Sequence, residues 1–266
     1  ELPFLVDRLS SIEGLDEVAL TTNGTLLSQY AKDLFEAGLS RLNISLDTLS
    51  AKTFEKISGR NQLDTCLEGI FKAQEVGFKN TKLDTVVIRN INDQEINDLL
   101  RFSIENDFNL RFIEYMDVGG ALDWEASKVV SAKEIISFIS NEFGPVAKID
   151  SADSAAPAKD YEILGGYKFG IIASMTEPFC SKCDRSRITA DGYWFDCLYA
   201  KDGFNFRELL RTEVDRKILL KKLRYLWGSR NAQTAVDRHL LKERQISYDL
   251  DALLEDPHLE MHTKGG

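Results

Sequence analysis

Stretches that favour β-strand alternate with stretches that favour helix through the first half of this 266-residue chain. β-branched and apolar residues mark the expected strands, and glycine or turn residues separate them from the expected helices. The strands are expected at 17–22, 41–47, 82–88 and 110–116, and the helices at 27–37, 51–58, 62–76, 93–106 and 131–143. Strands whose starts lie 24 to 41 residues apart, with helices between them, predict βαβ units and a parallel sheet or barrel.

A run of small residues over 151–158 interrupts this pattern and contains Pro157. Such a composition is typical of a loop or a domain joint. Beyond it we expect a hairpin around Gly165-Gly166, a strand over 169–173, and helices over 206–226 and 239–254. The sequence therefore predicts an α/β protein with two domains, residues 1–145 and residues 146–266.

The composition excludes several classes of protein. With 43 acidic residues against 33 lysines and arginines, the net charge of −10 argues against a partner that is nucleic acid or a membrane surface. The chain has no apolar stretch near the length of about 18 residues that a membrane span needs, and its first residues show no signal pattern. Four cysteines are too few for a disulfide scaffold, so we expect reduced thiols and a cytoplasmic protein. Cys66 falls in an expected helix and is interpreted as a small buried side chain.

The other three cysteines form a candidate metal site. Cys180, Cys183 and Cys197 have the spacing C-x2-C-x13-C. Three thiolates are one fewer than the usual four-cysteine zinc set, but they suit an iron–sulfur cluster that leaves one iron open. From the spacing alone, a zinc site with Asp, His or water as the fourth ligand is an equal alternative. Arg185 and Arg187 favour the cluster, because they place cations for an anionic ligand beside the metal.

Polar residues also occur where expected strands end. Thr21, Ser45 and Asp47 end two of the strands, and Met116 ends the last. In parallel barrels the carboxyl ends of the strands form the active-site face. The alternative is that these polar residues only cap the helices that follow.

Taken together, these segments resemble the GTP 3′,8-cyclase (MoaA) family of radical S-adenosylmethionine enzymes. The resemblance covers nearly the whole chain, and its segments follow the family's order. The matching segments are 21–24 (TTNG), 41–47 (RLNISLD), 82–88 (KLDTVVI), 111–116 (RFIEYM), 156–158 (APA), 169–172 (FGII), 179–187 (FCSKCDRSR), Gly192, Cys197-Leu198 and Gly265-Gly266.

The resemblance implies a fold and a reaction. The fold would be a partial radical SAM (β/α) barrel over 1–145, with about four of six strands, followed by an iron–sulfur and GTP-binding α+β region over 146–266. The reaction would convert GTP to (8S)-3′,8-cyclo-7,8-dihydroguanosine 5′-triphosphate in molybdenum cofactor biosynthesis. A 5′-deoxyadenosyl radical would abstract a ribose hydrogen, and the ring would then close onto guanine C8.

The resemblance also implies residue roles, although it identifies no catalytic group. Cys180, Cys183 and Cys197 would hold a [4Fe–4S] cluster whose open iron meets the guanine. Ser45 and Met116 would contact S-adenosylmethionine, and Gly265 and Gly266 would enter the active site as a tail. The residues implied for GTP are Thr21, Lys82, Arg111, Arg185, Ser186 and Arg187.

The sequence departs from the family in two places. The N-terminal C-x3-C-x2-C loop, whose cluster cleaves S-adenosylmethionine, and the Gly-Gly-Glu-Pro stretch after it are not among these residues, and Asp184 replaces the usual Asn. We therefore expect the activity, and a second cluster, in a longer parent, and no cyclisation by this chain alone. The alternatives are a nonenzymatic GTP-binding or iron–sulfur-binding module and a zinc-stabilised structural domain. The resemblance leaves a homodimer open and implies cyclic pyranopterin monophosphate synthase as the downstream partner.

Overall fold

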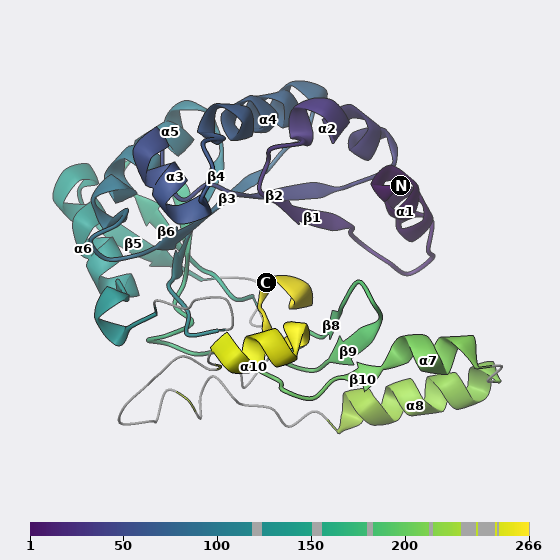
Figure 1. Ribbon diagram of the computed structural model, residues 1–266. Helices are drawn as coiled ribbons and strands as arrows, with labels where there is room; N and C mark the ends of the chain where they lie inside the picture. The colour runs from purple at the N-terminus through teal and green to yellow at the C-terminus, as the bar shows by residue number, and fades with distance from the viewer. Residues whose placement is uncertain are drawn as a thin grey trace. The chain divides into compact units, whose positions relative to one another are not determined.

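A computed structural model describes residues 1–118, 124–150, 156–179, 183–212, 215–229, 238, 248 and 250–265 (Figure 1). The chain divides into two compact units. The first unit comprises Glu1–Glu114, Val130–Ala152 and Ala158–Ala173. The second comprises Tyr115–Val129, Asp153–Pro157 and Ser174–Gly266.

The first unit is built on one sheet, which has seven strands in the order β1-β2-β3-β4-β7-β6-β5 among the described residues. Strands β1 to β4 and β7 run parallel, and β6 and β5 are antiparallel additions. The four strands expected from the sequence are confirmed as neighbouring parallel strands. The bounds are β1 (Ala19–Thr22), β2 (Arg41–Ser45), β3 (Lys82–Val87), β4 (Asn109–Glu114), β5 (Val146–Ile149), β6 (Lys159–Ile163) and β7 (Lys168–Ile172).

The sheet continues past the expected boundary between residues 145 and 146, so it has three more strands than the expected four. A hairpin causes this extension. Gly165 and Gly166 both have positive φ and turn β6 into β7, as the Gly-Gly pair predicted. Strand β7 then pairs with β4 in the register Arg111↔Gly170. An added Cβ on Gly170 would lie 3.4 Å from Arg111 Cγ and 3.3 Å from Ala158 Cβ, so glycine eases this approach.

Helices of the first unit lie along one side of its sheet (Figure 1). Local signals define their ends. Ser50 begins α3 by accepting from the Thr53 amide, and Ser131 and Glu134 form a capping box at α6. Gly59 and Gly77 end α3 and α4 in the left-handed conformation. The bounds are α1 (Leu2–Ser10), α2 (Leu27–Glu36), α3 (Ala51–Ser58), α4 (Leu63–Val76), α5 (Ile96–Glu105) and α6 (Ala132–Phe143), with a 3-10 turn, η1 (Asp93–Glu95), before α5.

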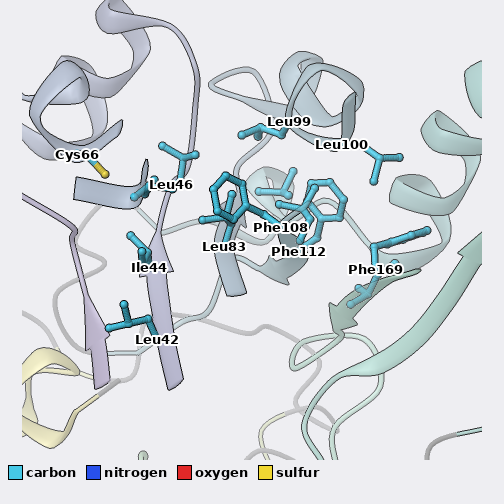
Figure 2. Close-up of a cluster of buried hydrophobic side chains, with 14 of the residues drawn as sticks. Leu42, Ile44, Leu46, Cys66, Leu83, Leu99, Leu100, Phe108, Phe112 and Phe169 are labelled. Atoms are coloured by element: carbon cyan, nitrogen blue, oxygen red, sulfur yellow. The ribbon is translucent and has the colours of Figure 1, made fainter. Parts of the chain in front are cut away.

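The core lies between the sheet and these helices. Leu42 and Ile44 of β2, Leu83 of β3 and Phe112 of β4 are fully buried and belong to one cluster with α5 side chains (Figure 2). Burying each such side chain contributes about 1.5–3 kcal/mol to folding. Cys66 of α4 is also fully buried, as expected from the sequence, and burial raises the pKa of its thiol to about 11.

Gly69 sets the distance of closest approach between α4 and the loop before α2. A Cβ at this position would lie 2.1 Å from the Gly24 carbonyl oxygen, which is backbone and has no freedom to rotate away. We expect Gly69→Ala to lower the free energy of unfolding by about 1–3 kcal/mol, measured by urea denaturation. Gly228→Ala is the control, because a Cβ there meets nothing within 4 Å. Equal losses in the two variants would contradict this account.

Among its described residues, the second unit has a three-stranded antiparallel sheet in the order β10-β9-β8. Its strands are β8 (Arg187–Ile188), β9 (Tyr193–Phe195) and β10 (Phe204–Asn205). Its helices include α7 (Phe206–Arg211), α8 (Arg216–Gly228) and α10 (Leu250–Glu255), and its 3-10 turns are η2 (Ala126–Lys128), η4 (Pro257–Leu259) and η5 (His262–Lys264).

The prediction of a single helix over 206–226 is wrong. The structure has two helices there, because Asp215 starts α8 by accepting from the Lys217 amide. Much of the helix expected over 239–254 falls outside the described residues, and its last part is α10. None of the described helices combines the length and hydropathy needed to cross a bilayer.

Candidate functional site

One face of the first unit's sheet is polar. Side chains alternate between the two faces of a strand, and directly paired residues of parallel strands point the same way. The register pairs Thr21 with Asn43 and Asn43 with Lys82, and it pairs Asp84 with both Ser45 and Arg111. The apolar residues between them fill the core on the other face. We call this set the polar face: Thr21, Arg41, Asn43, Ser45, Lys82, Asp84 and Arg111.

One half of the polar face is bonded internally. Arg41 donates to both carboxylate oxygens of Glu17, at 2.7 and 3.0 Å, and this charged hydrogen bond lowers the pKa of Glu17. Arg41 also donates to Asn43 Oδ1 at 3.0 Å, and Asn43 in turn donates to Thr21 Oγ1 at 3.4 Å. Thr21, one of the residues expected to bind GTP, is therefore held by a chain of contacts that begins outside the strands.

In the other half, some polar atoms have no hydrogen-bond partner among the described residues. Asp84 Oδ1 is buried and accepts no hydrogen bond from a described residue, although Arg111 Nη1 lies 3.6 Å away. Burial raises the pKa of Asp84. Lys82 makes no hydrogen bond or ion pair with the part of the chain that the structure describes. Burial, followed by the guanidinium groups of Arg111 and Arg41, lowers its pKa. Perturbed cations that lack fixed partners are typical of a ligand site.

The carboxyl ends of β2 and β3 are joined by a buried amide. Asn92 donates to the carbonyl oxygens of Asp47 and Val86, both at 2.8 Å, and accepts from the Ile88 amide at 2.7 Å. Asp47 Oδ1 accepts from the Val86 amide at 2.8 Å, and burial raises the pKa of Asp47 to about 6. Here Asp47 joins two strands and does not cap a helix.

This carboxylate predicts a pH-dependent stability. An unfolded aspartate has a pKa of about 3.9, so the folded state holds more protons between about pH 4 and 6, and stability falls as the pH rises through that window. We expect the free energy of unfolding of Asp47→Asn to be about 1–2 kcal/mol higher than that of the wild type at pH 7 and equal to it near pH 4. Between these pH values it should fall less steeply than that of the wild type. Urea denaturation across this range measures the difference. Asp16→Asn, at an exposed loop residue, is the control, and a decline of wild-type steepness in Asp47→Asn would count against the assignment.

In the second unit, two of the three candidate ligands lie near two arginines. Arg185 Nη2 donates to Cys183 Sγ at 3.3 Å, and its guanidinium lies 4.8 Å from the centroid of the Phe179 ring. Burial is the main cause of a lowered pKa at Arg187, and the nearby side chains of Cys197 and Cys183 oppose that shift. Cysteine sulfurs are donors of the type that holds an iron–sulfur cluster, and the cations beside them suit an anionic ligand, so these residues fit such a cluster. Cys180 lies outside the described residues.

Arg187 also holds the last described residues of the chain. Its Nη1 donates to the carbonyl oxygens of Lys264, at 3.2 Å, and Gly265, at 3.3 Å. Gly265 has a φ of +67°, which favours glycine there. Gly266 lies outside the described residues. An arginine expected to bind GTP and a glycine expected in the active-site tail are thus in direct contact.

The remaining expected residues are placed as follows. Ser45 is exposed at the end of β2, Ser186 is exposed just before β8, and Met116 is half-buried two residues after β4. The first unit brings Thr21, Ser45, Lys82 and Arg111 onto one face, and the second brings Cys183, Cys197, Arg185, Arg187 and Gly265 together.

Sequence reasoning missed Glu17, Asp84 and Lys264. Asp84 carried a usable signal, because a strand residue two positions after Lys82 must share its face. Glu17 and Lys264 carried none, since both act through contacts with residues far along the chain.

Comparison with known proteins covers nearly all of this chain. A family model described as Radical SAM superfamily matches residues 1–103, and one described as Molybdenum Cofactor Synthesis C matches residues 108–236.

Among curated proteins, GTP 3′,8-cyclase 3 of Mycobacterium bovis is 46% identical over 253 residues, which are 95% of this chain and 67% of the relative. GTP 3′,8-cyclase 1 of Mycobacterium tuberculosis is 43% identical over 270 residues, covering 100% of this chain and 75% of the relative. The GTP 3′,8-cyclase of Aquifex aeolicus is 40% identical over 250 residues, covering 92% and 74%. The chain thus spans between 67% and 75% of the length of these three relatives.

Proposed function

The chain belongs to the GTP 3′,8-cyclase family of radical S-adenosylmethionine lyases, and on this basis we propose that it takes part in converting GTP to (8S)-3′,8-cyclo-7,8-dihydroguanosine 5′-triphosphate. This reaction belongs to molybdenum cofactor biosynthesis. The product would pass to a cyclic pyranopterin monophosphate synthase. In this proposal the protein forms a homodimer.

The polar face is the observation that carries this proposal. Lys82 forms no hydrogen bond or ion pair with a described residue, and buried Asp84 Oδ1 accepts no hydrogen bond from one, its ion pair with Arg111 being long at 3.6 Å. A face built only for stability would pair such groups with each other, because an unsatisfied buried polar atom costs about 1–3 kcal/mol. GTP offers what both lack, since its phosphates accept hydrogen bonds and its ribose hydroxyls and base N–H groups donate them.

The cations divide between two surfaces in this proposal. Lys82 and Arg111 act from the polar face, and Thr21 adds a hydroxyl on the same face. Arg185 and Arg187 act from the cysteine segment, with Ser186 between them. Arginine presents a planar fork of donors that matches phosphate or the carbonyl edge of guanine.

Cys183 and Cys197, with Cys180, would hold a [4Fe–4S] cluster beside these arginines. Such a cluster supplies an open iron that can bind a donor atom of the guanine base. Ser45 and Met116 would contact S-adenosylmethionine, the source of the radical that attacks the ribose. The residues named here would bind and orient the substrate.

Anaerobic turnover tests this function. The full-length gene product is reconstituted with iron and sulfide and incubated with GTP, S-adenosylmethionine and dithionite, and its products are identified by mass spectrometry. We expect the 3′,8-cyclised nucleotide together with 5′-deoxyadenosine, and no cyclised product from ATP, whose purine edge has an amine where guanine has a carbonyl. GTP binding with neither product would favour a nonenzymatic binding module. Stoichiometric zinc without iron uptake would favour a structural domain.

A further inference from the structure

Lys264 is a buried cation with an unusual set of partners. Its side chain is 2% exposed, and its ammonium group donates to the carbonyl oxygens of Ala200 at 2.6 Å and Leu198 at 3.3 Å. It also lies 4.6 Å from the centroid of the Phe195 ring. These three residues belong to β9 and to the loop that follows Cys197. Lys264 is thereby attached to the segment that contains Cys197.

This arrangement suits an ammonium group in particular. No carboxylate of a described residue lies within ion-pair distance of Lys264, so its direct partners are two carbonyl oxygens and an aromatic face, with the Asp256 carboxylate acting only from farther away. Burial lowers the pKa of Lys264, because an ammonium group removed from water is less stable in its charged form. We call these two carbonyl oxygens and the Phe195 ring the cage. Gly203 allows close packing against it, because a Cβ at this position would lie 2.5 Å from the Phe195 ring. A methionine would fill the same space but offer the carbonyl oxygens no donor.

The main chain at Lys264 leads directly to Arg187. The Lys264 and Gly265 carbonyl oxygens both accept from Arg187 Nη1, whereas Nε and Nη2 of Arg187 make no hydrogen bond with a described residue. Arg187 is paired with Phe195 across β8 and β9, so the arginine and the ring that contacts Lys264 belong to one small sheet. The last described residues therefore fix Nη1 of the guanidinium group and use neither Nε nor Nη2.

We propose that Lys264 is a positioning residue, which anchors the last residues of the chain so that they hold Arg187 in its ligand-binding orientation. The functional part of this inference rests on the proposed function, in which Arg187 binds GTP. Lys264 itself contacts no ligand in this proposal.

Lys264→Met in the full-length protein tests the anchor. We expect the Kd for GTP, measured by calorimetry, to rise about tenfold, which is the size of one lost charge-assisted contact. KM for GTP should rise with it, and kcat should change by less than about threefold, because Lys264 acts on binding. Hydrogen exchange at the Lys264 and Gly265 amides should accelerate. Lys201→Met is the matched control, since Lys201 is an exposed lysine of the same loop, and it should change none of these quantities.

A double-mutant cycle separates positioning from general stability. If Lys264 acts through Arg187, then adding Lys264→Met to Arg187→Ala should not weaken GTP binding further. Additive losses would overturn the positioning role, as would faster exchange with an unchanged Kd. Unchanged hydrogen exchange at these two amides would contradict the claim that Lys264 anchors this segment. If the Met variant does not fold, Lys264→Gln, which keeps a donor but loses the charge, carries the same tests.

Failure of the proposed function gives a different result. A wild-type protein that binds no GTP would refute the function and with it the GTP-positioning role. The exchange measurement would still decide between an anchored and an unanchored tail, because it requires no ligand.

Discussion

Replacing Cys183 with serine is expected to abolish the intact iron–sulfur cluster. After anaerobic reconstitution, the 266-residue chain should hold about four iron and four sulfide, and Cys183→Ser should fall close to the background of adventitious metal. The reason is the small number of donors. With three cysteine ligands, losing one leaves two, and serine is a poor substitute for a thiolate. Elemental analysis and visible absorption measure the loss.

Cys66→Ser is the matched control for this experiment. Cys66 is fully buried in α4, and burial raises the pKa of its thiol to about 11, so it is protonated at neutral pH and unsuited to ligate iron. Its Sγ lies 3.9 Å from the Ser45 carbonyl oxygen, so a serine hydroxyl has a potential acceptor. Metal content should be unchanged in this variant. Equal loss of iron in both variants, or stoichiometric zinc in the wild type, would contradict the cluster assignment.

Arg187→Ala is expected to weaken GTP binding by roughly ten- to a hundredfold. A lost charge-assisted hydrogen bond costs about 1.5–3 kcal/mol, which converts to that range. The structure adds a second reason, since the same guanidinium group holds the Lys264 and Gly265 carbonyl oxygens and its removal frees the tail. Calorimetric titration of the full-length protein with GTP measures the effect.

Two variants make this result interpretable. Arg211→Ala removes an exposed arginine at the end of α7 and should leave GTP affinity unchanged. Arg187→Lys keeps the charge but loses the planar set of donors, so its affinity for GTP should lie between those of the wild type and Arg187→Ala. An unchanged affinity in Arg187→Ala would remove Arg187 from the GTP site.

Parts of the candidate site could be anticipated from the sequence. The alternation in Arg41-Leu42-Asn43-Ile44-Ser45 places polar and apolar residues on opposite faces once the strand is recognised, and Lys82 and Arg111 fall in strands of the same kind. The contacts between Arg41 and Glu17 and between Lys264 and Ala200 could not be anticipated. They join residues separated by 24 and 64 positions, and no local pattern specifies such pairs.

The same division holds for the fold. By itself, the sequence determined where β1 to β4 and their helices form, because glycine ends α3 and α4, Ser131 caps α6, and side-chain period distinguishes strand from helix over a few residues. Only the tertiary structure decided that β7 joins this sheet beside β4, since that pairing depends on the close approach of Gly170 to Arg111. It likewise decided that Lys264 is buried. A lysine near the end of a chain is exposed by default, and only a cage of two carbonyl groups and a ring, brought from residues 195–200, makes its burial tolerable.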